Sequence, residues 1–214
     1  ADPYLIGVAS SASLGAIIAL TTRVPENYGG ISILPMAAFA GSLIAVTVAY
    51  LIAHGSNNHS LTTLILAGVA IAYFTGATGS LLMIRSEADL RPIVSWLLGG
   101  FISTQWIHVA MMLPYILLSI FVVLVYGRIL NILQLGEEHS RQLGVTVNKA
   151  KLVLIAASSL ATAAAVAFRG PIGFVGLIAP HTVRLLWGVD YRTLLPMTML
   201  VGAGFLVIAD TVAR

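Results

Sequence analysis

The longest polar segment of the chain, residues 131–145, holds residue types that could dock a protein partner. Glu137 and Arg141 are spaced i,i+4 and can pair on one helical turn, and leucines alternate with the charges. Gly136 and Gly144 stand where short helices would begin and end, because glycine readily adopts the backbone conformations of helix caps. The spacing predicts a compact two-helix element. A solvated connector is the alternative, but it would need neither the leucines nor the glycines, so docking is at least equally supported.

A second segment, residues 170–184, combines several glycines with Pro180, His181 and Arg184. Pro180 would free one backbone carbonyl inside an apolar span, and the glycines would allow tight packing or an unwound stretch. His181 and Arg184 are spaced i,i+3 and would share a helix face near one membrane surface. Taken alone, Arg184 is typical of a snorkelling side chain that anchors a kinked helix end.

Motifs for catalysis are absent from these 214 residues. Without a G-x-x-x-x-G-K-[ST] loop the chain cannot cradle ATP in the P-loop manner, so any ATP would be hydrolysed by another protein. H-E-x-x-H and G-x-S-x-G are missing, the five histidines lack metal-ligand spacing, and there is no cysteine. Asp210 is the one acid well inside an apolar run, which suggests an ion or proton site. Its place four residues before Arg214 favours a structural neighbour instead. We expect no catalytic residue, no metal and no cofactor.

The elements that must position these residues are membrane spans. Hydrophobic residues make up 58% of the chain and charged residues 9%, against about 25% charged residues in a soluble domain. The mean hydropathy is +0.97. The net charge of +3 comes from scattered basic residues and excludes a nucleic-acid footprint. We therefore expect the chain to be embedded in membrane lipid.

Seven apolar stretches are candidates to cross the hydrocarbon layer, and the fifth and sixth of them are short. They are residues 5–22, 31–53, 61–84, 107–126, 152–168, 172–187 and 194–212. The fifth and sixth could form one broken helix, but Gly170-Pro171 is a strong turn signal and favours two. Residues 93–101, with Trp96 and Gly99-Gly100, are too short to cross and predict an interfacial or re-entrant helix.

Small residues recur every four positions, for example Gly7, Ser11 and Gly15, which predicts close helix packing in lipid. Leu34-Pro35-Met36 with Gly41 returns as Leu195-Pro196-Met197 with Gly202 at identical spacing. The copies are five spans apart, so they would lie in opposite orientation, as in inverted-repeat transporters. A full repeat would need ten spans, with two before Ala1 and one beyond Arg214.

Four motifs, in chain order, carry a resemblance to the FecCD-type permeases, which serve ABC importers of iron chelates, haem and cobalamin. They are residues 1–8 with Ser10 and Ser11; Trp96-Leu97-Leu98-Gly99-Gly100; Leu135-Gly136-Glu137-Glu138 with Arg141-Gln142-Leu143-Gly144; and Gly173-Phe174-Val175-Gly176-Leu177-Ile178-Ala179-Pro180-His181 with Arg184. Asp210 to Arg214 resembles the end of the family's ninth helix. The resemblance extends over essentially the whole chain.

This resemblance implies an all-α, polytopic membrane helix bundle of the cobalamin and iron-chelate permease type, with an inverted repeat. Residues 1–214 would be a single permease domain, incomplete at both ends, that supplies helices three to nine of ten. Residues 127–151 would be its cytoplasmic coupling loop. The protein would lie in the bacterial inner (plasma) membrane as a multi-pass subunit.

The resemblance also implies site residues for several roles. Coupling to an ATP-binding subunit would involve Leu135, Gly136, Glu137, Glu138, Arg141, Gln142, Leu143 and Gly144. The pathway or its gates would involve Gly68, Gly76, Trp96, Gly99 and Gly100. The family motif comprises Gly173, Gly176, Pro180, His181 and Arg184, and Arg214 would meet carboxylates of a binding protein.

The expected partners are an ATP-binding subunit, a second permease subunit that forms a homodimer or heterodimer, and a periplasmic or lipoprotein substrate-binding protein. The leading cargo is a ferric siderophore, with haem and cobalamin behind it. The chain would move cargo by alternating access without an ATPase site of its own.

Two other functions are alternatives. One is an ion-coupled secondary transporter with inverted repeats, which would need a coupling carboxylate near mid-membrane. The other is a non-transporting membrane scaffold.

Overall fold

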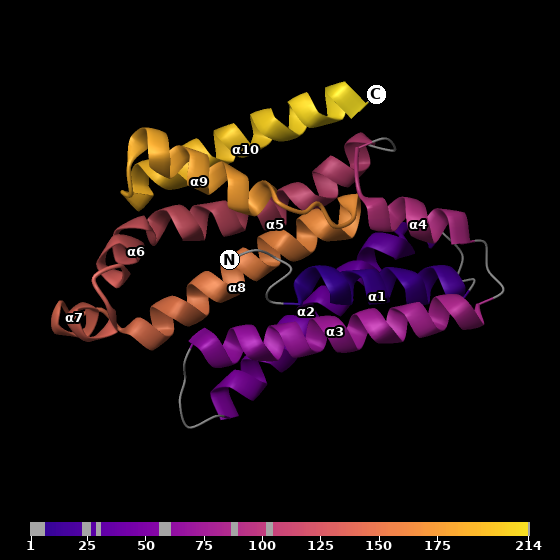
Figure 1. Ribbon diagram of the computed structural model, residues 1–214, viewed down its shortest axis with the longest axis horizontal. Coiled ribbons are helices and arrows are strands. Elements are labelled where there is room, and N and C mark those ends of the chain that lie inside the picture. Colours follow the sequence, from indigo (N-terminus) through magenta and orange to yellow (C-terminus); the bar gives the residue numbers. More distant parts are fainter. Residues whose placement is uncertain are drawn as a thin grey trace. The chain divides into compact units, whose positions relative to one another are not determined.

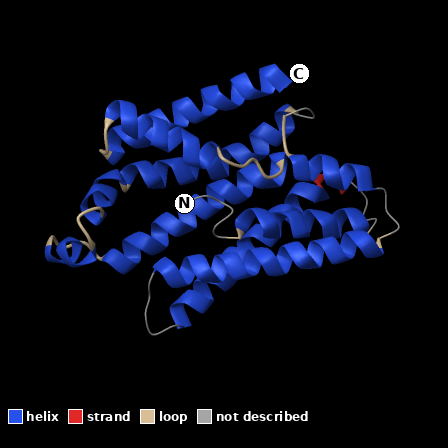
Figure 2. Cartoon of the chain, viewed as in Figure 1, coloured by secondary structure: helices blue, strands red, loops and turns tan. Residues whose placement is uncertain are grey.

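The computed structural model describes residues 7–22, 27–28, 31–55, 61–86, 90–101 and 105–213. Figures 1 and 2 show that these residues form helices almost throughout. In chain order the elements are α1 (Val8–Thr21), β1 (Asn27–Tyr28), β2 (Ile31–Ser32), α2 (Ile33–Gly55), α3 (Leu61–Arg85), α4 (Leu90–Leu98), α5 (Trp106–Val125), α6 (Gly127–Leu133), α7 (Glu137–Gln142), α8 (Val147–Arg169), α9 (Val175–Trp187) and α10 (Tyr191–Ala213). The two-residue strands pair antiparallel. The predicted all-α class is confirmed.

Each of the seven predicted spans coincides with a helix, although not all have the predicted length. Among the described residues, α2, α3, α5, α8 and α10 are long and apolar enough to cross a membrane. The prediction that the fifth span is short was wrong, since α8 has 23 residues. It begins at Val147 because Lys149 and Lys151, in its first five residues, are good helix formers that lower the hydropathy without ending the helix.

The predicted break between the fifth and sixth spans is confirmed. Helix α8 ends at Arg169, Gly170 takes a φ of +71°, and α9 begins only at Val175. The predicted short helix also exists, as α4, but it ends at Leu98. Its two glycines follow the helix rather than belonging to it, with φ of +67° at Gly99 and +133° at Gly100.

The chain divides into two compact units. The first comprises Ala1–Met112 with Thr162–Gly173, and the second comprises Leu113–Ala161 with Phe174–Arg214. In the first unit α1 packs against both α2 and α3. Small side chains fill its centre: Ala12, Ala16, Ala38, Val166 and Ala167, with Trp96 and Phe168 packed against them.

Glycines bring the backbones of α1 and α2 into contact. A Cβ added at Gly15 would lie 2.2 Å from the carbonyl oxygen of Ala37, and one added at Gly41 would lie 2.4 Å from that of Ser11. Ser42 is fully buried and donates to the Ala38 carbonyl at 3.0 Å. The predicted stripe of small residues is therefore a packing surface. In lipid such contact holds helices together, because apolar burial alone gives no preference for a helix neighbour over lipid.

The second unit contains a helix pair that repeats features of α1 and α2. Helices α9 and α10 lie side by side (Figure 1). The residue before α1, Gly7, and the residue before α9, Phe174, both take left-handed conformations. Gly202 of α10 packs on α9: a Cβ added at Gly202 would lie 3.5 Å from the Cβ of Ala179. Gly41 of α2 packs on α1 in the same way. These shared contacts agree with the repeat seen in the sequence.

The α1–α2 contact leads to a stability prediction. We expect Gly15→Ala to lower the free energy of unfolding by about 1–3 kcal/mol, because the new methyl group meets backbone that cannot rotate away. SDS titration of the detergent-solubilised protein, followed by circular dichroism, measures the change. Gly76→Ala is the matched control, since a Cβ at Gly76 meets nothing within 4 Å. Equal stability of the two variants would contradict the packing role.

Candidate functional site

The predicted two-helix element between α5 and α8 is present, as α6 followed by α7. Gly136, with a φ of +99°, precedes α7. Gly144 ends it at a φ of +80°, with its N–H bonded to Arg141 O and the Val145 N–H bonded to Ser140 O, each at 3.0 Å. This pair of bonds is a Schellman motif, which requires a residue with positive φ at Gly144. Both glycines act as the sequence predicted.

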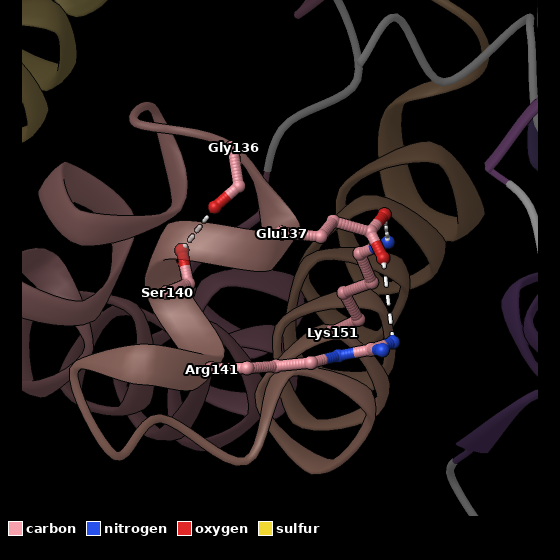
Figure 3. A network of polar contacts seen from close by, with 5 residues as sticks. All are labelled: Gly136, Glu137, Ser140, Arg141 and Lys151. Carbon is pink, nitrogen blue, oxygen red and sulfur yellow. Dashed lines mark hydrogen bonds and ion pairs between the residues drawn. The ribbon is translucent and has the colours of Figure 1, made fainter.

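Ser140 holds α7 against the end of α6 and was not singled out from the sequence. Its side chain is fully buried. The hydroxyl lies 3.0 Å from Ile132 O and 2.7 Å from Gly136 O, so it can donate to either carbonyl. Figure 3 shows the contact with Gly136. A small hydroxyl among charged neighbours was the only sequence signal. The bond gives this short helix an internal anchor that charge pairs on its surface could not provide.

Glu137 sits between two cations. Figure 3 shows its carboxylate facing the ammonium of Lys151, which donates a hydrogen bond to it, and the guanidinium of Arg141 at 3.8 Å. The Arg141 pair was predicted, but Lys151 on α8 was not. The hydrogen bond from Lys151, aided by the charges of both cations, holds the pKa of Glu137 below its ordinary value of 4.5. Glu137 thus ties α7 to the start of α8.

The two leucines that flank α7 are apolar and exposed, whereas Glu137 is charged and paired within the chain. Leu135 is 62% exposed and Leu143 is 60% exposed. Glu138 and Gln142 are also exposed. The element therefore presents two apolar side chains at the ends of a charged turn whose backbone is fixed by caps. Such an arrangement can supply apolar anchors with a polar rim to a protein partner.

A polar cluster missed by the sequence reading joins α6 to the turn between α9 and α10. Asn131 Nδ2 donates to Asp190 Oδ1 at 2.6 Å, and Asn131 Oδ1 accepts the Tyr191 N–H at 2.8 Å. Gln134 Nε2 donates to Val189 O at 3.2 Å. Hydrogen bonds from the Arg192 backbone and from Asn131 lower the pKa of Asp190. No local pattern pointed to these pairs, because the partners are about 60 residues apart in sequence.

The glycine, proline and histidine segment forms the start of α9. Pro180 lies inside this continuous helix, and it cannot donate to the carbonyl of Gly176. Gly176 and His181 are exposed, and Gly173 and Pro180 are half-buried. Arg184 Nη2 donates to the Tyr191 hydroxyl at 3.1 Å, and its guanidinium lies 5.8 Å from the centre of that ring. Arg184 is thus engaged within the second unit.

Phe174 was named only as part of the motif, yet its backbone is unusual. Its φ of +66° is the one positive φ of a non-glycine residue among those described. For a residue with a bulky Cβ this conformation costs about 1–2 kcal/mol. The side chain is exposed. No sequence signal predicted this conformation, because glycines stand on either side at Gly173 and Gly176 and would have been the expected sites.

The gate candidates lie in the first unit, and their surroundings differ. Trp96 packs against the core, and the carbonyl of Trp96 would lie 2.2 Å from a Cβ added at Gly170. A Cβ at Gly99 would lie 2.7 Å from Pro171 O, and the Gly100 N–H donates to Arg169 O at 3.0 Å. The end of α4 is therefore seated on the turn that follows α8.

The two glycines of α3 occupy different environments. Gly68 is buried, and its carbonyl would lie 2.8 Å from a Cβ at Gly7. Gly76 is exposed. Of the last predicted residues, Asp210 is half-buried, and Arg214 lies outside the described residues. Within the part of the chain that the structure describes, no three His, Asp or Glu side chains gather as a metal site.

Comparison with known proteins gives consistent matches. The model of the FecCD transport family matches residues 1–214. The cobalamin import system permease protein BtuC of Halobacterium salinarum is 45% identical over the whole chain, which covers 57% of that protein. The hemin transport system permease protein HmuU of Yersinia pestis is 39% identical, again over the whole chain and 64% of the relative.

A solved structure has the same fold. It is described as an inward-facing conformation of a candidate metal-chelate type ABC transporter, with a TM-score of 0.89 and 33% identity over 99% of this chain and 67% of that one. The chain spans about three fifths of the length of the curated relatives. These matches and the five long apolar helices confirm the predicted polytopic fold and its place in the inner (plasma) membrane.

The Glu137 cluster leads to a pH prediction. A lowered pKa means that the ion pairs stabilise α7 above pH 4.5 and that this contribution is lost as the pH falls through the lowered value. We expect Glu137→Gln to speed hydrogen exchange of α7 amides at pH 7 by up to about fivefold, since pairs this exposed contribute at most about 1 kcal/mol. Exchange corrected for intrinsic rates measures this. A variant effect that shows no decline as the pH is lowered far below 4.5 would contradict the role of the charge.

Proposed function

The chain belongs to the FecCD transport family, and on that premise we propose that it is the membrane-spanning permease part of an ABC importer. It forms part of the pathway through the membrane. In this proposal ATP is hydrolysed in a separate ATP-binding subunit. The 214 residues themselves hold no P-loop motif. The import cycle is alternating access, in which ATP-driven movement of that subunit changes which side of the pathway is open.

The observation that carries this proposal is the ordered element formed by α6 and α7. A loop that only connected α5 to α8 would need no Schellman motif, no buried serine anchor and no ion pair to the next helix. Its exposed Leu135 and Leu143 suit apolar pockets of a protein partner. We take this element to be the coupling contact with the ATP-binding subunit.

The charges of the element divide between two tasks. Glu137 is committed within the chain to Lys151 and Arg141. Glu138 and Gln142 are exposed beside Leu143 and are available to form the polar rim of the contact. A change at Glu137 would therefore disturb α7 itself, so the leucines give the cleaner test of docking.

Further partners follow from the same proposal. A second permease copy or homologue would complete the pathway, lined in part by the region of Gly76, Gly99 and Gly100. A substrate-binding protein would deliver the cargo on the outer side, where Arg214 would face its carboxylates. The cargo would be a bulky metal chelate: a ferric siderophore, haem or cobalamin. The relatives named for cobalamin and hemin support that class.

The coupling assignment predicts a specific loss. We expect Leu135→Ser with Leu143→Ser to reduce ATP-driven import by at least tenfold. If the leucines are hot spots of the contact, their truncation costs about 2 kcal/mol or more, and about 1.4 kcal/mol already corresponds to a factor of ten. Import into proteoliposomes that contain the complete transporter measures it, beside the affinity for the ATP-binding subunit.

The control for the leucine variant is Leu185→Ser on α9, which alters a leucine that is 75% exposed but lies outside the α6–α7 element. It should leave the affinity for the ATP-binding subunit unchanged. Wild-type affinity and import in the double serine variant would remove α6–α7 from the coupling contact.

The cargo proposal is tested by direct competition. The complete transporter in proteoliposomes is offered radiolabelled cobalamin, haem and ferric siderophore in turn, with ATP inside or without it. We expect ATP-dependent accumulation of one of the three, and suppression of its uptake by the same unlabelled chelate. Accumulation of none of them, together with ion-gradient-driven uptake of a small solute, would overturn the importer assignment.

A further inference from the structure

The two polar ends of Asn131 are both occupied by the turn between α9 and α10. Its amide nitrogen donates to the Asp190 carboxylate at 2.6 Å, and its amide oxygen accepts the Tyr191 N–H at 2.8 Å. A single side chain on α6 thus bonds both a side chain and the backbone of the other segment. An amide held at both ends cannot rotate without breaking a bond, so its direction is fixed.

These contacts also complete the N-terminus of α10. The first N–H groups of a helix lack partners within the helix. Asp190 accepts the Arg192 N–H at 2.9 Å and so acts as the N-cap. The N–H of Tyr191, one residue earlier, also has no partner within the helix, and it donates to Asn131 Oδ1 from α6. Helix α10 therefore begins on a cap shared between its own residue and a residue of the docking element.

Neighbouring contacts extend this junction on both sides. Gln134, three residues after Asn131 on the same turn, donates to Val189 O at 3.2 Å. Arg184 of α9 donates to the Tyr191 hydroxyl at 3.1 Å. The Asp190 carboxylate is charged at neutral pH, so the bond from Asn131 is charge-assisted, and that bond is one of the causes that lower the pKa of Asp190. Asp190 alone would be enough to cap α10. The additional hydrogen bonds from Asn131 of α6 therefore point to a role other than capping.

We infer that Asn131 and Asp190 are positioning residues that fasten the α6–α7 element to the start of α10, so that movement of the element is passed directly into that membrane helix. This inference rests on the proposed coupling function. The junction gives α6–α7 a rigid route to α10, which belongs to the same compact unit, besides its chain connections to α5 and α8. Breaking it should leave ATP hydrolysis intact and reduce the import that each hydrolysis event drives.

The test reverses the chemistry of the pair. In Asn131→Asp two carboxylates face each other, and the donor to Asp190 is lost. In the double variant Asn131→Asp/Asp190→Asn the amide at 190 can donate to the new carboxylate and still accept the Arg192 N–H. The complete transporter is placed in proteoliposomes and offered radiolabelled cobalamin, haem and ferric siderophore in turn. We expect the import per ATP hydrolysed to fall about tenfold in the single variant, the factor expected from the loss of one charge-assisted hydrogen bond. The double variant should recover most of it.

A second readout does not depend on transport. The 214 residues contain no cysteine, so spin labels can be attached at Arg128→Cys on α6 and Val189→Cys before α10. Pulsed electron paramagnetic resonance then measures the distance between the two labels. The distance distribution should be narrow and equal with and without ATP. It should broaden in Asn131→Asp and narrow again in the double variant.

Each outcome has a defined meaning. A distribution in Asn131→Asp as narrow as in the parent, or ATP hydrolysis and import that fall in parallel, would overturn the inference. Failure of the double variant to recover would do the same. Absence of ATP-driven import in the unaltered transporter would instead count against the proposed function, while the spin-label distances would still decide whether the junction holds α6 to α10.

Discussion

Contact between helix backbones at small residues is the constraint on which the first unit depends. In lipid, an apolar side chain gains little by leaving the hydrocarbon, so helices stay together only where their surfaces fit closely. At Gly15 and Gly41 the fit leaves no room for a single added carbon. The buried alanines around Ala38 and Ala167 continue this surface, and Ser42 adds a hydrogen bond within it. The larger apolar side chains are left exposed for lipid or for further helices.

The α6–α7 element is held by a different kind of interaction. It lies between two membrane helices and owes its shape to hydrogen bonds: a Schellman motif at Gly144, the buried hydroxyl of Ser140 and the link from Glu137 to Lys151. The shared cap formed by Asn131 and Asp190 then fastens it to α10. Directional polar bonds of this kind fix an orientation, which is what an element that transmits force from a partner requires. In the proposed coupling role, the exposed Leu135 and Leu143 would supply the attraction to that partner.

Sequence reasoning found the features that have a local signature. Apolar runs located the membrane helices, Gly170-Pro171 predicted the break before α9, and the spacing of Glu137 and Arg141 predicted their ion pair. It shortened α8, because lysines in a first turn lower hydropathy without ending a helix. It missed Lys151 as the second partner of Glu137, and the Asn131–Asp190 pair across 59 residues. Such contacts depend on how helices pack, and no spacing rule along the chain encodes them.

The central claim is that α6–α7 is the surface on which an ATP-binding subunit docks, and cross-linking tests it most directly. A photo-reactive benzoyl-phenylalanine is placed at Leu143 in the complete transporter, and in a parallel sample at Leu185. We expect a cross-link to the ATP-binding subunit from position 143 and none from position 185. A cross-link only from position 185, or from neither in a complex that still hydrolyses ATP and imports, would contradict it.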